Sequence, residues 1–400
     1  MSIARNPSAL PAMGEERRVS ALLPIMGVVL VAFLVIGFAM PVLPLHVHDG
    51  LGFGTIIVGL VAGSQFAAAL ISRPMAGSYA DRHGGKRAVL VGFGIAIAAG
   101  LLYLLSWHFM SETVISVSVL LLGRLLLGVA ESYLITGSVN WGFGLVNQKD
   151  TGRVIAWVGA AMFGAFALGA PIGAALFDRF GFASIAWATT LAPLVTLLLV
   201  LPLRGVAPIA RGRQGFASVL RAVWAPGLGS ALSSVAFGGI TAFVTLLYAE
   251  RGWAHGWLPY SVFAGVFILA RLAFGHLPDR LGGARVAMIC LVIEAAGQAL
   301  LWFAPTPELA LVGAGLTGLG YSLVYPSFGV EAMLRVPPEA RGLAMGAYTA
   351  FLDLALGVSG PLLGLIAAGA GLRSVFLTGA IVGLSAVPIG LLLSRRKIAS

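Results

Sequence analysis

Twelve long apolar runs, separated by short connections, constrain this chain more than any other feature of its sequence. Each run has the roughly 20 residues that a helix needs to cross a hydrocarbon core about 30 Å thick. Of the 400 residues, 59% are hydrophobic and only 10% are charged, whereas a soluble domain averages about 25% charged residues. The sequence therefore predicts an all-α membrane protein with twelve transmembrane helices and no sizeable soluble domain. The runs cover residues 21–45, 55–79, 88–107, 113–145, 154–176, 182–203, 225–249, 258–278, 286–304, 309–333, 343–368 and 374–394.

Basic residues lie almost entirely on one side of this predicted membrane. If the N-terminus is cytoplasmic, the cytoplasmic segments hold 19 of the 25 Lys and Arg residues, and the opposite side holds three. By the positive-inside rule, this bias predicts a multi-pass protein of the bacterial inner membrane with both termini in the cytoplasm. The net charge of +10 does not indicate nucleic-acid binding, because the basic residues form short bursts between apolar runs.

A repeated segment divides the chain into two halves. The stretch from Arg73 to Arg87 returns as Arg271 to Arg285 at an offset of 198 residues, with Asp-Arg-x-Gly-Gly in both copies. A second repeat relates Gly169-Ala-Pro171-Ile-Gly173 to Gly360-Pro361-Leu-Leu-Gly364, with an offset of 190 between the prolines. Such repeats indicate two pseudo-symmetric six-helix bundles related by an axis along the membrane normal. We expect an N-terminal half at 1–203, a basic cytoplasmic linker at 204–222 and a C-terminal half at 223–400.

The first repeat also carries a family resemblance. The pattern Gly77-x3-Asp81-Arg82-x-Gly84-x-Lys86-Arg87 resembles the cytoplasmic loop signature of the major facilitator superfamily, and Arg124-x3-Gly128 resembles its second motif. The family's antiporter motif carries Gly-Pro, which Gly360-Pro361 matches and Gly169-Ala-Pro171 does not. The stretch from Arg271 to Trp302 is most similar to poorly characterised bacterial permeases of the YhhS and YfcJ type. These likenesses imply a secondary carrier, with a suggestion of efflux.

The two loops of the repeat are predicted to gate the transporter. Asp81 and Asp279 can accept hydrogen bonds from free N–H groups at a neighbouring helix N-terminus, and Gly84 and Gly282 permit a tight turn. The resemblance implies that each loop latches against the opposite half when the cytoplasmic side is closed; the alternative is that these charges only set the topology. The predicted gating residues are Gly77, Asp81, Arg82, Gly84, Arg87, Gly275, Asp279, Arg280, Gly282 and Arg285.

Charged residues inside the spans are candidates for the mechanism, because a charge at a helix centre costs about 2.5 to 3.5 kcal/mol on insertion scales. Arg124 and Glu131 are seven residues apart, so they share one face of the fourth span. The resemblance implies that this span lines the central cavity. We expect Glu131 to carry the proton and Arg124 to modulate it or contact the substrate; the alternative is a permanent ion pair. Asp353, which has no basic residue within a turn, is a second expected titrating site.

Other polar residues complete the predicted sites. Glu294 is expected to form a structural ion pair with Arg271, because the resemblance places the ninth span at the periphery. The neutral groups of Gln65, Asn140 and Tyr325 are expected near the cavity, although such groups often serve only to join helices.

The leading function is therefore a proton-coupled antiporter that exports a small organic solute. A proton-coupled uptake symporter for a metabolite is the alternative. An integral membrane enzyme or a channel is less favoured: the six histidines lie in loops or at span ends without metal-ligand spacing, and no Gly-Lys-Ser phosphate loop is present. The expected partners are a small-molecule substrate, protons and the lipid bilayer. We predict a monomer without cofactor, metal or nucleic acid.

Overall fold

The computed structural model describes residues 15–145, 151–206, 216–337 and 341–396, and every regular element in these ranges is a helix. The elements follow in chain order: α1 (Glu15–Ala39), α2 (Leu43–Leu45), η1 (His46–Gly50), α3 (Thr55–His83), α4 (Gly85–His108), α5 (Thr113–Leu145), α6 (Thr151–Phe180), α7 (Phe182–Val200), α8 (Phe216–Glu250), α9 (Leu258–Phe274), α10 (Leu277–Leu281), α11 (Gly283–Phe303), α12 (Pro307–Met333), α13 (Arg341–Ala370), α14 (Arg373–Leu384) and α15 (Val387–Arg396).

The helices confirm the twelve predicted crossings. Eleven segments of the described chain are long and apolar enough to cross a membrane, and the shorter apolar helix α9 supplies the twelfth. The first crossing combines α1, α2 and η1, and the last combines α14 and α15. Helix α8 begins at Phe216, well before the apolar run at 225, because no Gly or Pro interrupts the chain before Pro226 and polar residues do not end a helix.

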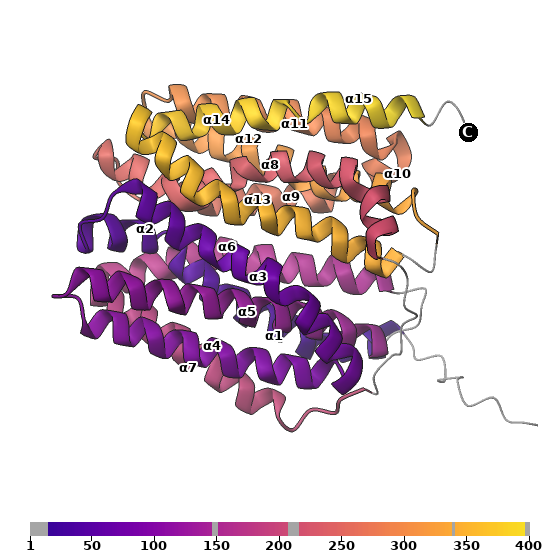
Figure 1. Ribbon diagram of the computed structural model, residues 1–400, viewed down its shortest axis with the longest axis horizontal. Coiled ribbons are helices and arrows are strands. Elements are labelled where there is room, and N and C mark those ends of the chain that lie inside the picture. Colours follow the sequence, from indigo (N-terminus) through magenta and orange to yellow (C-terminus); the bar gives the residue numbers. More distant parts are fainter. Residues whose placement is uncertain (1–14, 146–150, 207–215, 338–340, 397–400) are drawn as a thin grey trace, which may run out of the picture.

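Connections alternate between the two ends of the bundle. One end, which we call the basic end, carries the turn between α3 and α4, the turn between α10 and α11, and the start of α8; α2 and η1 lie at the far end (Figure 1). Gly84 and Gly282 have φ angles of +91° and +90°. Side chains with a Cβ rarely adopt this conformation, so glycine makes both turns possible, as predicted.

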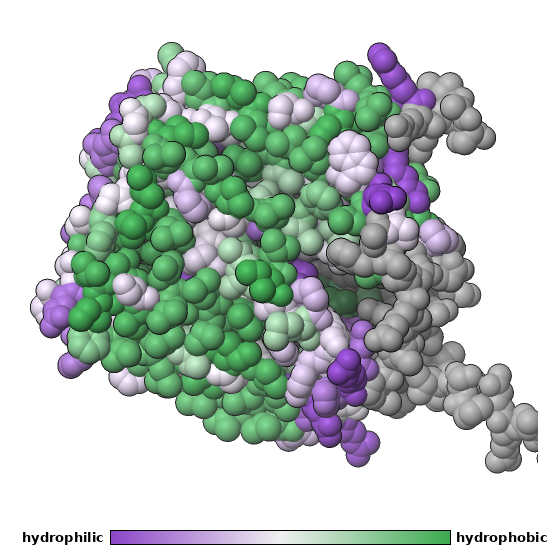
Figure 2. Space-filling view, viewed as in Figure 1, coloured by the Kyte–Doolittle hydropathy of each residue, from purple (hydrophilic) through white to green (hydrophobic). Residues whose placement is uncertain are grey.

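The surface has the polarity of a membrane protein. Apolar residues cover the middle of the face shown in Figure 2, while hydrophilic residues gather toward its two ends. Ile71 on α3 and Leu272 on α9 are 74% and 73% exposed, which suits a lipid-facing position. At the basic end Arg82, Arg87, Arg280 and Arg285 are exposed.

Two six-helix bundles make up the fold. Helices α1 to α7 form the N-terminal bundle, drawn in indigo to magenta in Figure 1, and α8 to α15 form the C-terminal bundle, drawn toward yellow. The bundles meet mainly where α3 packs on α13 and where α6 packs on α9. Residues 207–215 of the predicted linker lie outside the described residues, so the domain limits stay a prediction.

A candidate transport site between the two bundles

Helices α3 and α13 approach each other backbone to backbone toward the far end. A Cβ added at Gly59 would collide with the carbonyl of Gly360, and one added at Gly63 would meet the carbonyl of Gly357 at 2.7 Å. Nearer the far end, the Thr55 hydroxyl donates a 2.8 Å hydrogen bond to the Gly364 carbonyl. Small residues allow this approach, so Gly360 and Gly364 of the second repeat help to join the two bundles at this contact.

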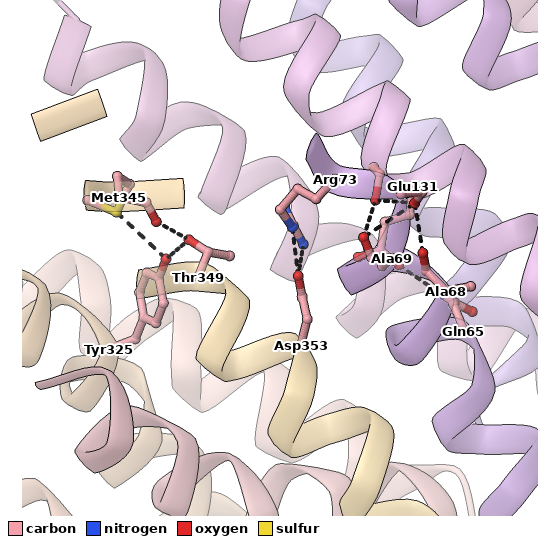
Figure 3. A network of polar contacts seen from close by, with 11 residues as sticks. Gln65, Ala68, Ala69, Arg73, Glu131, Tyr325, Met345, Thr349 and Asp353 are labelled. Atoms are coloured by element: carbon pink, nitrogen blue, oxygen red, sulfur yellow. Dashed lines mark hydrogen bonds and ion pairs between the residues drawn. The ribbon is translucent and has the colours of Figure 1, made fainter. Parts of the chain in front are cut away.

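An ion pair lies on the basic side of the glycine contact. The Nε and Nη2 atoms of Arg73 on α3 are each 2.6 Å from Oδ2 of Asp353 on α13. Figure 3 shows the two side chains pointing toward each other across the boundary between the bundles. Asp353 is only 2% exposed, so its carboxylate depends on Arg73 for compensation. The sequence placed both residues inside spans but gave no sign that they meet.

The second contact between the bundles is aromatic. Phe163 on α6 stacks on Phe267 on α9, with ring centroids 3.6 Å apart. The Ser261 hydroxyl of α9 donates a 3.3 Å hydrogen bond to the Ala167 carbonyl of α6. The guanidinium carbon of Arg271 lies 5.5 Å from the centroid of Phe267, one turn before it on the same helix. The two inter-bundle contacts therefore differ: one contains an ion pair and the other an aromatic stack.

Glu131 on α5 faces α3, beside the first contact. Its Oε2 accepts a 2.7 Å hydrogen bond from the Gln65 side-chain amide (Figure 3). Glu131 is within electrostatic range of Arg73, Arg124 and Asp353. With Arg73 and Asp353 it forms a charged cluster that both bundles contribute to. Glu131 also borders a small, otherwise apolar pocket inside the N-terminal bundle, lined by Phe33, Ile36, Phe93 and Leu127 among others.

Arg124, like Glu131, faces α3, but the two side chains do not pair. Its Nε and Nη2 atoms donate to the carbonyls of Val61 and Ala62 on α3, at 3.2 and 3.3 Å. Among the described residues no ion pair joins Arg124 and Glu131, so the alternative of a permanent pair on α5 is not realised in this structure. The shared helix face was predictable from the spacing, whereas the separate partners were not.

The predicted pair between Arg271 and Glu294 is not formed. Glu294 is 1% exposed, and its Oε2 accepts a 2.6 Å hydrogen bond from Ser233 on α8. Glu294 faces the interior of the C-terminal bundle, where a Cβ added at Gly320 of α12 would press against it. Arg271 instead lies on the same side of α9 as Phe267, and its guanidinium approaches the Phe267 ring. The expectation was wrong because the two side chains point to different neighbours.

Tyr325 belongs to a small polar group on α12 and α13. Its hydroxyl lies 2.7 Å from Oγ1 of Thr349, which in turn donates to the Met345 carbonyl (Figure 3). Since the Thr349 proton is used in that second bond, Tyr325 is the donor to Thr349. Thr349 and Met345 were not predicted from the sequence, because a lone Thr and a lone Met in an apolar helix carry no signal.

Asn140 lies at the basic end instead of near a cavity. Its side-chain amide donates a long, 3.4 Å hydrogen bond to Oδ1 of Asp81. This contact lies within the N-terminal bundle, beside the turn between α3 and α4. In the same loop, Lys86 donates to the Leu201 carbonyl at 2.7 Å and to the Leu203 carbonyl, at the end of α7.

The cap on the N-terminus of α11 comes from an unpredicted residue. Oε1 of Glu331, at the end of α12, accepts a 3.1 Å hydrogen bond from the Ala284 amide, and its Oε2 pairs with Arg335 at 3.0 Å. A carboxylate at this position is stabilised by the free N–H groups and the dipole of α11. Glu331 thus does within one bundle what Asp279 was expected to do, while the latch between bundles stays a prediction.

These features define a class of protein: a membrane carrier whose two helical bundles enclose a charged contact. A family model described as Major Facilitator Superfamily matches residues 25–285 and 228–399. The chain belongs to the major facilitator superfamily, and it is a transporter and not an enzyme.

Relatives and solved structures agree with this assignment. An uncharacterized MFS-type transporter of Pseudomonas aeruginosa is 44% identical over 417 residues and 99% of both chains. An uncharacterized MFS-type transporter of Burkholderia mallei is 42% identical over 378 residues, which cover 92% of this chain and 90% of the relative. The expected likeness to YhhS and YfcJ permeases is not addressed by these relatives and stays a prediction.

The fold is similar to that of two solved transporters. The nucleoside transporter NupG superposes with a TM-score of 0.75 over 93% of this chain and 99% of its own, at 16% identity. The human organic anion transporter MFSD10 gives a TM-score of 0.70 over 94% of this chain and all of its own, also at 16% identity. At this identity the likeness concerns the fold alone.

Proposed function

We propose that this transporter is a proton-coupled secondary carrier that moves a small organic solute by alternating access between its two bundles. The observation that supports it most is the charged cluster of Arg73, Asp353 and Glu131, which two bundles contribute together. Opening the far end requires α3 and α13 to separate, and this motion would disturb the only ion pair found between the bundles in the described part of the chain.

Proton coupling follows from the cost of separating these charges. A carboxylate that loses its arginine partner while still away from water is expensive to keep ionised. Binding a proton removes the charge, so protonation and separation of the bundles favour one another. In this scheme Glu131 carries the proton and Asp353 is a second proton site. Arg124 and Arg73 both modulate Glu131, and Arg73 is also the partner of Asp353.

Efflux by antiport is the proposed direction, with uptake by symport as the alternative. The likeness of the segment from Arg271 to Trp302 to efflux permeases favours export. The two solved transporters are named for organic anions and nucleosides, which are both small organic solutes, and they support only that broad class. The loops around Asp81 and Asp279 are proposed to latch when the basic end closes.

A flux assay tests the proposed function. Inverted vesicles containing the transporter are energised, a quenched pH dye reports the proton gradient, and a panel of organic solutes is added one at a time. For an antiporter we expect a transported solute to release protons from the acidified lumen and partly restore the dye fluorescence. If labelled solute crosses the membrane with no dependence on the gradient, proton coupling is wrong.

The proposed topology places the basic end and both termini in the cytoplasm of the bacterial inner membrane. The sole cysteine, Cys290, is buried, so a Cys290→Ser background is suitable for labelling. We expect a membrane-impermeant maleimide to label Asp49→Cys, exposed at the far end, in intact cells. It should label Arg204→Cys only in inverted vesicles. The opposite labelling would contradict the topology. His46 is unsuitable because it is buried against Phe182.

A further inference from the structure

Arg73 and Arg271 occupy equivalent places in the two repeats. They are related by the offset of 198 residues, and each lies where a helix of one bundle crosses a helix of the other. Arg271 continues a buried stripe on α9 that includes Tyr260, Phe263 and Phe267, while Leu272 on the other side of the helix is exposed. Arg271 therefore points between the helices and not toward lipid.

The symmetry is broken in the partner of each arginine. At the offset of 190 that relates Pro171 to Pro361, the position equivalent to Asp353 is Phe163. Asp353 supplies the carboxylate for Arg73, whereas Phe163 supplies only a ring that stacks on Phe267. In the described part of the chain the side chain of Arg271 makes no ion pair and no hydrogen bond. One of the two equivalent arginines is thus left without an anion.

The surroundings of Arg271 suit an anionic ligand. Its electrostatic partners are the hydroxyl groups of Tyr321, Tyr325 and Tyr348, and no carboxylate is among them. Tyr325 also senses Arg73 and Asp353, so the unpaired arginine is adjacent to the charged cluster. Arg271 is only partly buried. A cation held among aromatic side chains and hydroxyls without an anion is costly, and a ligand carboxylate would offset that cost.

We propose that Arg271 binds the carboxylate of an organic monoanion. The ligand carboxylate pairs with Arg271 as the Asp353 carboxylate pairs with Arg73. The planar guanidinium offers a fork of donors that matches a carboxylate. Phe267 packs against the guanidinium and stacks on Phe163, so the surroundings of Arg271 are apolar and suit an apolar body next to the carboxylate. This inference rests on the proposed function for the substrate's route, and it names the substrate class as organic carboxylates.

Equilibrium binding to the purified, full-length protein tests the proposal. Three carboxylates, benzoate, salicylate and nicotinate, are compared with their neutral amides by isothermal titration calorimetry. At least one carboxylate should bind more tightly than its amide. Arg271→Gln should weaken that carboxylate on the order of tenfold to a hundredfold and leave the amide almost unchanged, as expected for the loss of a charged hydrogen bond.

Two further variants keep the test decisive. Arg251→Gln is a matched control, because Arg251 also lies over an aromatic ring, at 5.9 Å from the Trp253 centroid, but at the far end; it should bind like the wild type. If Arg271→Gln does not fold, Phe163→Asp, which places a competing carboxylate at the equivalent position, should weaken the carboxylate while Phe163→Asn does not. The proposal is wrong if no carboxylate binds, if amides bind equally well, or if these variants leave the preference intact.

The result separates this inference from the proposed function. Carboxylate binding that depends on Arg271, together with gradient-independent flux in vesicles, would support the site and contradict proton coupling. Proton-driven transport of neutral or cationic solutes that is unaffected in Arg271→Gln would support the carrier and overturn the assignment of substrate class.

Discussion

Asp353→Asn is expected to lower transport by about a hundredfold and to destabilise the protein, because it leaves Arg73 unpaired between the two bundles. Removing one partner of a buried pair typically costs about 3 to 5 kcal/mol, and each 1.4 kcal/mol is about a factor of ten. Arg73→Gln should be similarly harmful, because it leaves the carboxylate of Asp353 without its cation. The measurements are thermal unfolding of the purified protein and solute flux in vesicles.

The double variant Arg73→Gln/Asp353→Asn distinguishes a pair from two independent residues. Neutralising both partners removes the uncompensated charge, so thermal stability should return most of the way to wild type. Gradient-driven transport should stay low, since the proposed proton site at Asp353 is gone. Asp49→Asn, an exposed acid at the far end, is the control and should change neither quantity. If the two effects simply add, with no coupling energy, the pair does not act as a unit.

Glu131→Gln is expected to reduce gradient-driven transport by about a hundredfold while solute exchange continues. Glutamine has nearly the same shape, and its side-chain carbonyl can still accept the hydrogen bond from Gln65. What it cannot do is bind and release a proton. In the proposed mechanism, exchange of labelled for unlabelled solute needs only the motion of the bundles, whereas movement against a gradient needs the proton. The two assays should therefore give different results in this variant.

Glu294→Gln is the matched control for this experiment. Glu294 is also a buried carboxyl group with a single described hydrogen-bond partner, Ser233, but it lies inside the C-terminal bundle, away from the inter-bundle contact. We expect it to keep gradient-driven transport within about threefold of wild type. Equal loss in both variants, or wild-type pH dependence of transport in Glu131→Gln, would show that Glu131 does not carry the coupled proton.

The sequence by itself determined the elements of the fold. Burying unpaired backbone polar groups in hydrocarbon is so costly that long apolar runs must form helices. The twelve spans could therefore be located from the apolar runs in the sequence. The predicted span 113–145 matches α5 at both ends, and Gly84 and Gly282 form the turns that their repeated spacing indicated. The repeat predicted two bundles, because two segments of similar sequence, separated by about half the chain, are expected to fold alike.

Only the tertiary structure decided which polar groups meet. Arg73 pairs with Asp353, which is 280 residues away in the sequence. Glu294 accepts a hydrogen bond from Ser233 and does not pair with Arg271. Glu331 caps the N-terminus of α11. Helical spacing tells which residues share a face, but not which neighbouring helix that face touches or at what height two helices cross. Contacts within one helix follow from the helical period, whereas contacts between helices follow from how the helices pack. The partners of the charged residues in this transporter are therefore visible only in the tertiary structure.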